Sequence, residues 1–264
     1  MNLLKIIKHP VFYLNYFLKR LRPFQINKNG IFFFVKYKPF WKDVQSGKWE
    51  ASTFKIFDKF LDKEHSFIDI GAWLGPTVLY GCQIAKHCYA IEPDSIAFKE
   101  LYKNIGLNIG LKEKISVFNF AIGNQRGKIK FGTKTKFGDS MSSILFGGEI
   151  NSLLIDSISL QDFFQDNKIN DCNFIKMDIE GGEVVVLPNI KDFLQKNKFT
   201  IYLSLHPKLF KDVKGDSQLI IETLKIYKNI FDINGKLLDL DALLTALLDK
   251  DFFEVVITDK NWPI

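Results

Sequence analysis

From Ser66 onward, short apolar runs alternate with longer segments in which apolar residues recur at helical spacing. The runs predict strands at SFIDI (66–70), CYAIE (88–92), ISVFNFAI (115–122), CNFIKMDI (172–179), FTIYLSLH (199–206) and FFEVVITD (252–259). The intervening segments predict helices over 76–86, 94–108, 183–196 and 216–229. This alternation indicates an α/β fold: a mostly parallel sheet covered by helices on both faces. In such a sheet, ligands bind beyond the carboxyl ends of the strands.

Two regions depart from this alternation. Residues 123–151 are rich in Gly, Lys and Ser and predict a hairpin followed by an exposed loop, which is either a substrate lid or surface decoration. Residues 1–60 mix large apolar side chains with basic ones and are predicted as a partly helical N-terminal extension. The main domain is then expected over residues 61–264.

Composition narrows the class of protein. The 264 residues are 47% hydrophobic and 25% charged, which suits a globular chain with a full core. The three cysteines form no CxxC pair, so we expect reduced thiols, a cytoplasmic location and no zinc site. No apolar run reaches the roughly 20 residues of a membrane span. The apolar N-terminus is interrupted by charges and lacks a small-residue cleavage site, so no signal peptide is expected.

The basic charge is concentrated near the N-terminus. Residues 1–48 contain ten Lys or Arg against one Asp, about +9, whereas the remainder carries about −3. Three interpretations remain open. A helix over residues 3–21 could lie on an anionic membrane, close to a lipid-linked glycan. The aromatic and basic residues could instead contact nucleic acid, or the apolar groups could cover the sheet or form a dimer interface.

The stretch FIDIGAWLG predicts a ligand-binding turn. The strand ends at Asp69, and Gly71 allows a sharp turn into a helix whose free N–H groups face a ligand. In YAIEPD, Glu92 lies at the tip of the next strand, where a carboxylate accepts hydrogen bonds from ribose hydroxyls. NAD and S-adenosylmethionine both carry such a ribose. Trp73 occupies the place of the second glycine of a dinucleotide fingerprint, which favours S-adenosylmethionine over NAD.

A second polar group follows later strands. NFIKMDIEGGE places Lys176, Asp178 and Glu180 in alternation at a strand end, so their side chains point the same way while the strand persists. Clustered carboxylates need a cation, a metal or a shared proton. Lys176 is read equally well as a salt-bridge partner. His206 ends another strand in SLHP and titrates near neutral pH, which suits a general base.

These motifs, in this order and spacing, resemble the FkbM family of S-adenosylmethionine-dependent methyltransferases over residues 67–207. The resemblance implies the class I methyltransferase fold, a Rossmann-like sheet of seven strands with the last strand antiparallel. It also implies O-methylation of sugars, polyketides or related natural products. By position, Asp69, Gly71 and Gly75 would line the methionine end of the cofactor, Glu92 would hold the ribose, and Phe120 and Ala121 would flank the adenine. The predicted cofactor-binding set also includes their neighbours Ala72, Trp73 and Pro93.

The resemblance further implies that Asp178, Glu180 and His206 face the transferred methyl group. We predict Asp178 or His206 as the base and Glu180 as the residue that orients it or binds substrate hydroxyls. No metal is predicted, with Mg²⁺ on Asp178 and Glu180 as the alternative. Two features depart from the family pattern: Trp73 and Pro76 replace small or polar residues of the turn, and Ser204 stands where an acid is frequent.

The predicted function is therefore transfer of a methyl group to a hydroxyl of a small molecule, glycan or lipid-linked glycan. The alternatives are a ribose-directed RNA methyltransferase and an inactive binding protein on the same scaffold. Base methylation is not expected, because MDIEGGE stands where amino-methylating enzymes carry Asn or Asp followed by Pro-Pro and an aromatic residue. A nucleic-acid partner is therefore not expected, and the sequence leaves homo-oligomer formation open.

Overall fold

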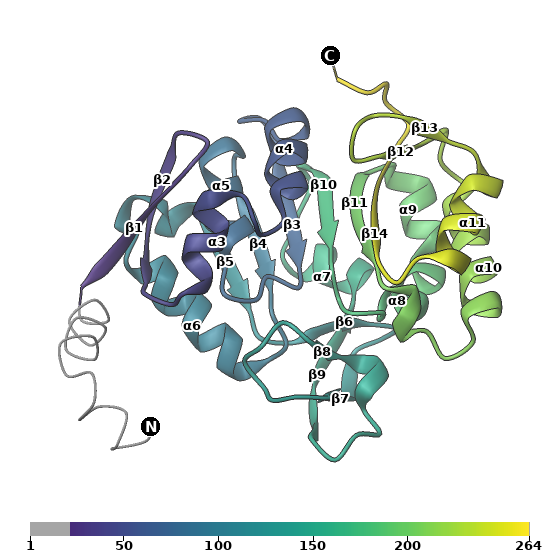
Figure 1. Ribbon diagram of the computed structural model, residues 1–264, viewed down its shortest axis with the longest axis horizontal. Helices are drawn as coiled ribbons and strands as arrows, with labels where there is room; N and C mark the ends of the chain where they lie inside the picture. The colour runs from purple at the N-terminus through teal and green to yellow at the C-terminus, as the bar shows by residue number, and fades with distance from the viewer. Residues whose placement is uncertain (1–21, 264) are drawn as a thin grey trace.

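The computed structural model describes residues 22–263, and its centre is one eight-stranded sheet (Figure 1). From one edge to the other the order is β13-β12-β14-β11-β10-β3-β4-β5. Strands β3, β4, β5, β10 and β11 are parallel, whereas β14 runs antiparallel to both β11 and β12. This confirms the class I methyltransferase sheet, to which β13 adds a short edge strand. The strands are β3 (Ser66–Ile70), β4 (Cys88–Ile91), β5 (Ile115–Phe118), β10 (Cys172–Met177), β11 (Thr200–Leu205), β12 (Asn229–Asp232), β13 (Leu237–Leu238) and β14 (Phe253–Thr258).

Helices cover both faces of this sheet because successive side chains of each strand point to opposite sides. Phe67 of β3 packs into a cluster with α3, α4, α5 and α6, whereas Ile68 packs into the cluster formed with α7 to α11. The first group comprises α3 (Phe40–Ser46), α4 (Ala51–Phe60), α5 (Pro76–Ile84) and α6 (Ser95–Gly106). The second comprises α7 (Leu160–Asp166), α8 (Glu183–Asn189), α9 (Lys191–Asn197), α10 (Val213–Leu224) and α11 (Leu240–Asp249).

A second, four-stranded sheet contains the Gly- and Lys-rich region. Its order is β6-β9-β7-β8, and β7 pairs antiparallel with β9, which refines the predicted hairpin. The predicted strand 115–122 is in fact two strands, because β5 ends at Phe118 and β6 belongs to this second sheet. Asn119 lies at the break and donates from Nδ2 to the carbonyl of Glu92 at 2.8 Å. The strands are β6 (Ala121–Gly123), β7 (Gly127–Thr133), β8 (Ser142–Ser143) and β9 (Ser152–Ser159).

Residues 22–60 share the core of the main domain. The hairpin of β1 (Pro23–Lys28) and β2 (Ile31–Lys36) buries Phe33 and Val35 in the same cluster as Phe67. Asn104 and Asn108 of the α6 region hold β2 by hydrogen bonds to its backbone. The predicted boundary at residue 60 stays a prediction, and the predicted helix over residues 3–21 lies outside the described residues. No helix in residues 22–263 has the length and hydropathy that a membrane span requires.

Three other predicted segments differ in detail. The segment 183–196 forms two helices, α8 and α9, which meet at Ile190. The helix predicted over 216–229 begins earlier, capped by the Asp212 carboxylate that accepts from Gly215 N, and ends at Leu224. Residues 229–232 instead form β12, which completes the far side of the sheet beside β14.

Candidate active site

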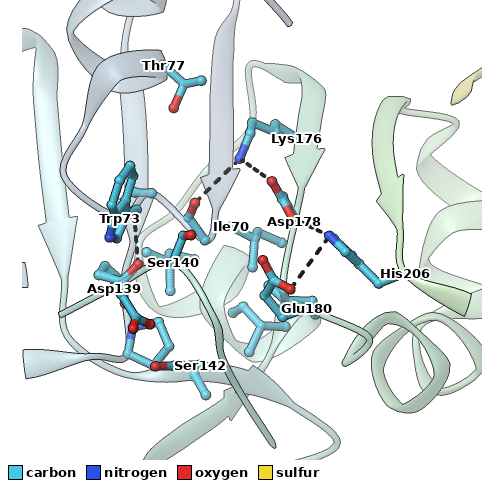
Figure 2. A pocket seen from close by; sticks show the side chains of 18 of the residues that line it. Ile70, Trp73, Thr77, Asp139, Ser140, Ser142, Lys176, Asp178, Glu180 and His206 are labelled. Atoms are coloured by element: carbon cyan, nitrogen blue, oxygen red, sulfur yellow. Dashed lines mark hydrogen bonds and ion pairs between the residues drawn. The ribbon is translucent and has the colours of Figure 1, made fainter. Parts of the chain in front are cut away.

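A cavity of about 260 Å³ opens at the carboxyl ends of β3, β4, β10 and β11 (Figure 2). The turn after β3 contributes Gly71, Ala72 and Trp73, the end of β4 contributes Glu92 and Pro93, and β6 contributes Ala121. Asp178, Glu180 and His206 line the same cavity from the ends of β10 and β11. The topology therefore brings together the two groups of residues that the sequence singled out.

The turn after β3 has no room for a side chain at Gly71. Gly71 has φ +88°, and a Cβ there would lie 1.9 Å from the carbonyl oxygen of Asp178. The Asp178 N–H in turn donates to the Ile70 carbonyl at 3.0 Å, so the ends of β3 and β10 are in direct contact. Gly71 is thus required by a close approach of two backbones as well as by its left-handed conformation.

Glu92 is fixed by the turn that it faces. Its carboxylate accepts hydrogen bonds from the backbone N–H groups of Trp73 and Asp94, each at 2.7 Å. Burial raises the pKa of Glu92 to about 8, although both N–H groups favour its ionised form. Trp73 itself has φ +46°, an uncommon conformation for a large residue, and this conformation accompanies the bond of its N–H to Glu92. The remaining acceptor sites of the carboxylate are compatible with a bound ribose.

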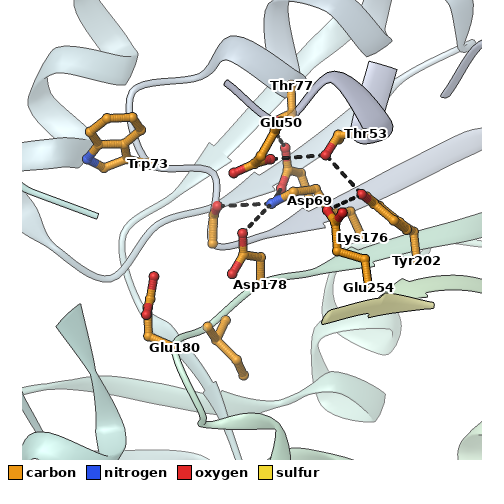
Figure 3. Close-up of polar contacts among 12 residues, drawn as sticks. Glu50, Thr53, Asp69, Trp73, Thr77, Lys176, Asp178, Glu180, Tyr202 and Glu254 are labelled. Atoms are coloured by element: carbon orange, nitrogen blue, oxygen red, sulfur yellow. Dashed lines mark hydrogen bonds and ion pairs between the residues drawn. The ribbon is translucent and has the colours of Figure 1, made fainter. Parts of the chain in front are cut away.

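Lys176 links the strand ends beneath the cavity (Figure 3). Its Nζ lies 3.2 Å from Asp69 Oδ1 and 3.9 Å from Asp178 Oδ2, and it donates to the Gly71 carbonyl at 3.4 Å. Burial alone would lower the pKa of Lys176, but the carboxylates of Asp69, Asp178 and Glu50 raise it. The salt-bridge interpretation of Lys176 is thereby confirmed, and the cation also lies beside one oxygen of Asp178.

His206 faces three carboxylates. Its Nε2 lies 3.7 Å from both Asp178 Oδ1 and Glu180 Oε2, and its Nδ1 lies 3.9 Å from Glu183 Oε1. Burial alone would lower the pKa of His206, but these carboxylates raise it to about 9. Burial raises the pKa of Glu180 to about 7, against the attraction of His206. Although β10 ends at Met177, the left-handed turn at Glu180 (φ +53°) keeps its side chain in the cavity.

Asp69, Gly75 and Phe120, three of the predicted cofactor-binding residues, lie outside the cavity lining. Asp69 is fully buried and binds Lys176 and the Thr77 hydroxyl. Gly75 is the N-cap of α5 with φ +89°, and a Cβ there would lie 2.4 Å from Leu101 Cδ1. The ring of Phe120 packs against Phe118 and Phe163, away from the cavity. Their placement makes Asp69 and Gly75 supports of the turn, whereas direct contact with a cofactor stays a prediction.

Several lining residues were not identified from the sequence. Trp49 and Glu50 come from the N-terminal segment, and Asp139, Ser140 and Ser142 come from the loop proposed as a lid. A short chain of hydrogen bonds holds Glu50: its carboxylate accepts from Thr53, whose hydroxyl contacts Tyr202, which donates to Glu254 (Figure 3). Burial and then the nearby Asp178 raise the pKa of Glu50 to about 8. The left-handed backbone of Glu50 (φ +37°) leaves no recognisable sequence signal.

Comparison with known proteins identifies a family. The family model described as methyltransferase FkbM domain matches residues 69–236. Among solved structures, the chain is similar to the methyltransferase FkbM of Methylobacillus flagellatus, at 18% identity and a TM-score of 0.48, covering 76% of this chain and 44% of that one. It is also similar to precorrin 8w decarboxylase of Methanobacterium thermoautotrophicum, at 15% identity and a TM-score of 0.43, covering 80% of this chain and 89% of that one. No curated protein matches the sequence.

A further similar structure is TrmK of M. capricolum in complex with S-adenosyl-homocysteine, at 14% identity and a TM-score of 0.43, covering 79% of this chain and 68% of that one. The sheet order and the cavity at its strand ends define a class I methyltransferase fold. Since the family model matches more than half of the 264 residues, the chain belongs to the FkbM methyltransferase family. S-adenosylmethionine is accordingly its cofactor.

Proposed function

We propose that this protein transfers the methyl group of S-adenosylmethionine to a hydroxyl oxygen of a sugar, a glycan or a related natural product. The observation that carries the proposal is the position of Asp178, Glu180 and His206 in the same cavity as the cofactor turn. These three side chains offer hydrogen-bonding groups for a polyhydroxylated acceptor beside the cofactor. The wall formed by Trp49 adds an aromatic surface against which an apolar face of such an acceptor would pack.

The chemistry is an in-line displacement. The acceptor oxygen forms a bond to the methyl carbon, the carbon–sulfur bond breaks, and its electron pair remains on sulfur, which gives S-adenosylhomocysteine. The hydroxyl proton passes to the carboxylate of Asp178, which lines the cavity and pairs with Lys176. Glu180 and His206 orient the acceptor. The protein's main contribution is then to align the oxygen with the methyl group and to exclude water.

The direct test is methyl transfer from deuteromethyl S-adenosylmethionine to a panel of saccharides, lipid-linked glycans, polyketides and RNA, followed by mass spectrometry. Label on a hydroxyl of a saccharide or polyketide is expected. Label only on RNA ribose would replace the proposal by its first rival. Failure of the folded protein to bind S-adenosylhomocysteine in calorimetry would favour a non-catalytic scaffold.

The substitution Asp178→Asn tests whether Asp178 is the general base. The substitution keeps the shape of the side chain, and we expect kcat to fall about 10²- to 10⁴-fold while the affinity for S-adenosylhomocysteine is kept. Asp156→Asn is the matched control, because Asp156 is exposed and pairs with Lys128 on the second sheet, outside the cavity. Equal activity of Asp178→Asn and the control would remove Asp178 from the mechanism.

A further inference from the structure

Three potential metal ligands converge at the acceptor side of the cavity. Asp178, Glu180 and His206 each offer one ligand atom, and these atoms lie within 4.8 Å of one another. His206 Nε2 is 3.7 Å from a carboxylate oxygen of each acid. All three side chains are partly exposed to the cavity, so the open side of the cluster faces the space in which an acceptor would bind.

A second, independent feature lies behind the cluster. Glu183 is fully buried, and its Oε1 accepts from Ile179 N at 3.0 Å and lies 3.9 Å from His206 Nδ1. Within the described residues, Glu183 Oε2 and His206 Nδ1 have no hydrogen-bond partner. A buried carboxylate behind the distal nitrogen of an imidazole is the arrangement that orients a metal-binding histidine. With its Nδ1 proton facing Glu183 Oε1, the imidazole of His206 leaves Nε2 free to bind a cation.

The geometry and the ligand types restrict the cation. Adjacent ligands of an octahedral ion at about 2.1 Å lie about 3 Å apart, so the pairs at 3.7 Å need to approach by less than 1 Å. Carboxylates suit Mg²⁺ and Mn²⁺, and the imidazole favours a first-row transition ion over Mg²⁺. Lys176, 3.9 Å from Asp178 Oδ2, leaves Oδ1 for the ion.

We propose that Asp178, Glu180 and His206 bind one divalent ion of the Mn²⁺ type, with Glu183 orienting His206, and that the ion coordinates the acceptor's oxygen. Only the contact with the acceptor rests on the proposed function, since the ion would bind whether or not the chain methylates a hydroxyl. The open coordination positions face the cavity and are filled by water until the acceptor arrives.

The experiment measures Mn²⁺ binding without any acceptor. Full-length protein is freed of metal by chelation and titrated with Mn²⁺, and the free ion is followed by its electron paramagnetic resonance signal. We expect one ion per chain. His206→Asn and Asp178→Asn should each weaken binding at least tenfold, whereas the control Asp156→Asn should bind normally. Circular dichroism checks that each variant is folded.

Glu183→Gln distinguishes the oriented arrangement from a simple cluster of charges. Glutamine retains an acceptor for Ile179 N but removes the carboxylate facing His206, so we expect affinity for Mn²⁺ to fall about 10- to 100-fold. Absence of one-to-one binding by folded wild type, or unchanged binding in both ligand variants, would overturn the site. Methyl transfer that is identical with and without Mn²⁺ would overturn the acceptor contact and leave the proposed O-methylation intact.

Discussion

Lys176 and Asp69 form an ion pair that is almost completely removed from water. The two atoms, Nζ and Oδ1, lie 3.2 Å apart, and the side chains are 3% and 0% exposed. The pair joins β3 to β10 directly below the turn that forms the cofactor side of the cavity. Lys176, whose charge supports the turn, thus comes from β10, the strand that Asp178 directly follows.

Removing one partner of this pair should destabilise the fold. In Lys176→Met, Asp69 remains buried without its cation, and we expect the free energy of unfolding to fall by about 3–5 kcal/mol in urea titrations. The double variant Asp69→Asn/Lys176→Met leaves no unpaired charge and should recover part of that loss. If the double variant lost more unfolding free energy than the two single variants lose together, a favourable pairing would be contradicted.

Gly71→Ala should damage both stability and cofactor binding. The added Cβ meets the Asp178 carbonyl in a left-handed backbone, so we expect a loss of more than about 1 kcal/mol in unfolding free energy and a weaker affinity for S-adenosylhomocysteine. Gly106→Ala is the control: Gly106 ends α6 and has no atoms within 4 Å of the new Cβ. That variant should be as stable as wild type or up to about 1 kcal/mol more stable.

Cofactor affinity should depend on pH through Glu92. The ionised carboxylate is the better acceptor for ribose hydroxyls, and the pKa of Glu92 in the free protein is raised to about 8. Binding therefore requires loss of a proton below pH 8, and affinity should rise about tenfold per pH unit up to that value and then level off. Calorimetric titration with S-adenosylhomocysteine from pH 6 to 9 measures this change in affinity. Glu92→Gln should bind more weakly and lose the part of this pH dependence that Glu92 contributes, while the part due to Glu50 remains, and a profile identical to wild type would refute the ribose assignment.

Glu50 is expected to face the ammonium group of the cofactor. It lines the cavity with Gly71 and Ala72, and the Thr53 hydroxyl holds its carboxylate in place. Loss of one charge-assisted hydrogen bond in Glu50→Gln should weaken S-adenosylhomocysteine about 10- to 100-fold. Methylthioadenosine lacks the amino acid part and is the matched ligand, so its affinity should not change. Equal weakening of both ligands would place Glu50 elsewhere in the cavity.

The sequence allowed the strand ends to be predicted because their signals are local. An apolar run followed by Asp-x-Gly, or by His-Pro, marks the point where a strand stops, and parallel strands bring such points to one edge. This is why Glu92, Asp178 and His206, all predicted at strand ends, line one cavity, whereas their roles stay predictions. Residues that reach the cavity through contacts distant in the sequence could not be predicted in this way. Trp49 and Glu50 line the cavity immediately before α4, which packs on α5.

Asp69 illustrates the opposite difficulty. Its position at a strand end is typical of a residue that contacts a ligand, yet the adjacent strand places Lys176 beside it, and the pair is buried together. Whether a strand-end carboxylate faces a ligand or a neighbouring cation depends on the register between strands, which local patterns do not contain.

The region matched by the family model, residues 69–236, is smaller than the unit that must fold as one piece. It excludes α4, whose Phe57 packs against Phe174, and β14, which lies between β11 and β12 and pairs with both. A protein trimmed to the matched residues would expose two unpaired strand edges and a bare aromatic surface. Such a fragment would self-associate, so binding studies of this protein require the flanking segments.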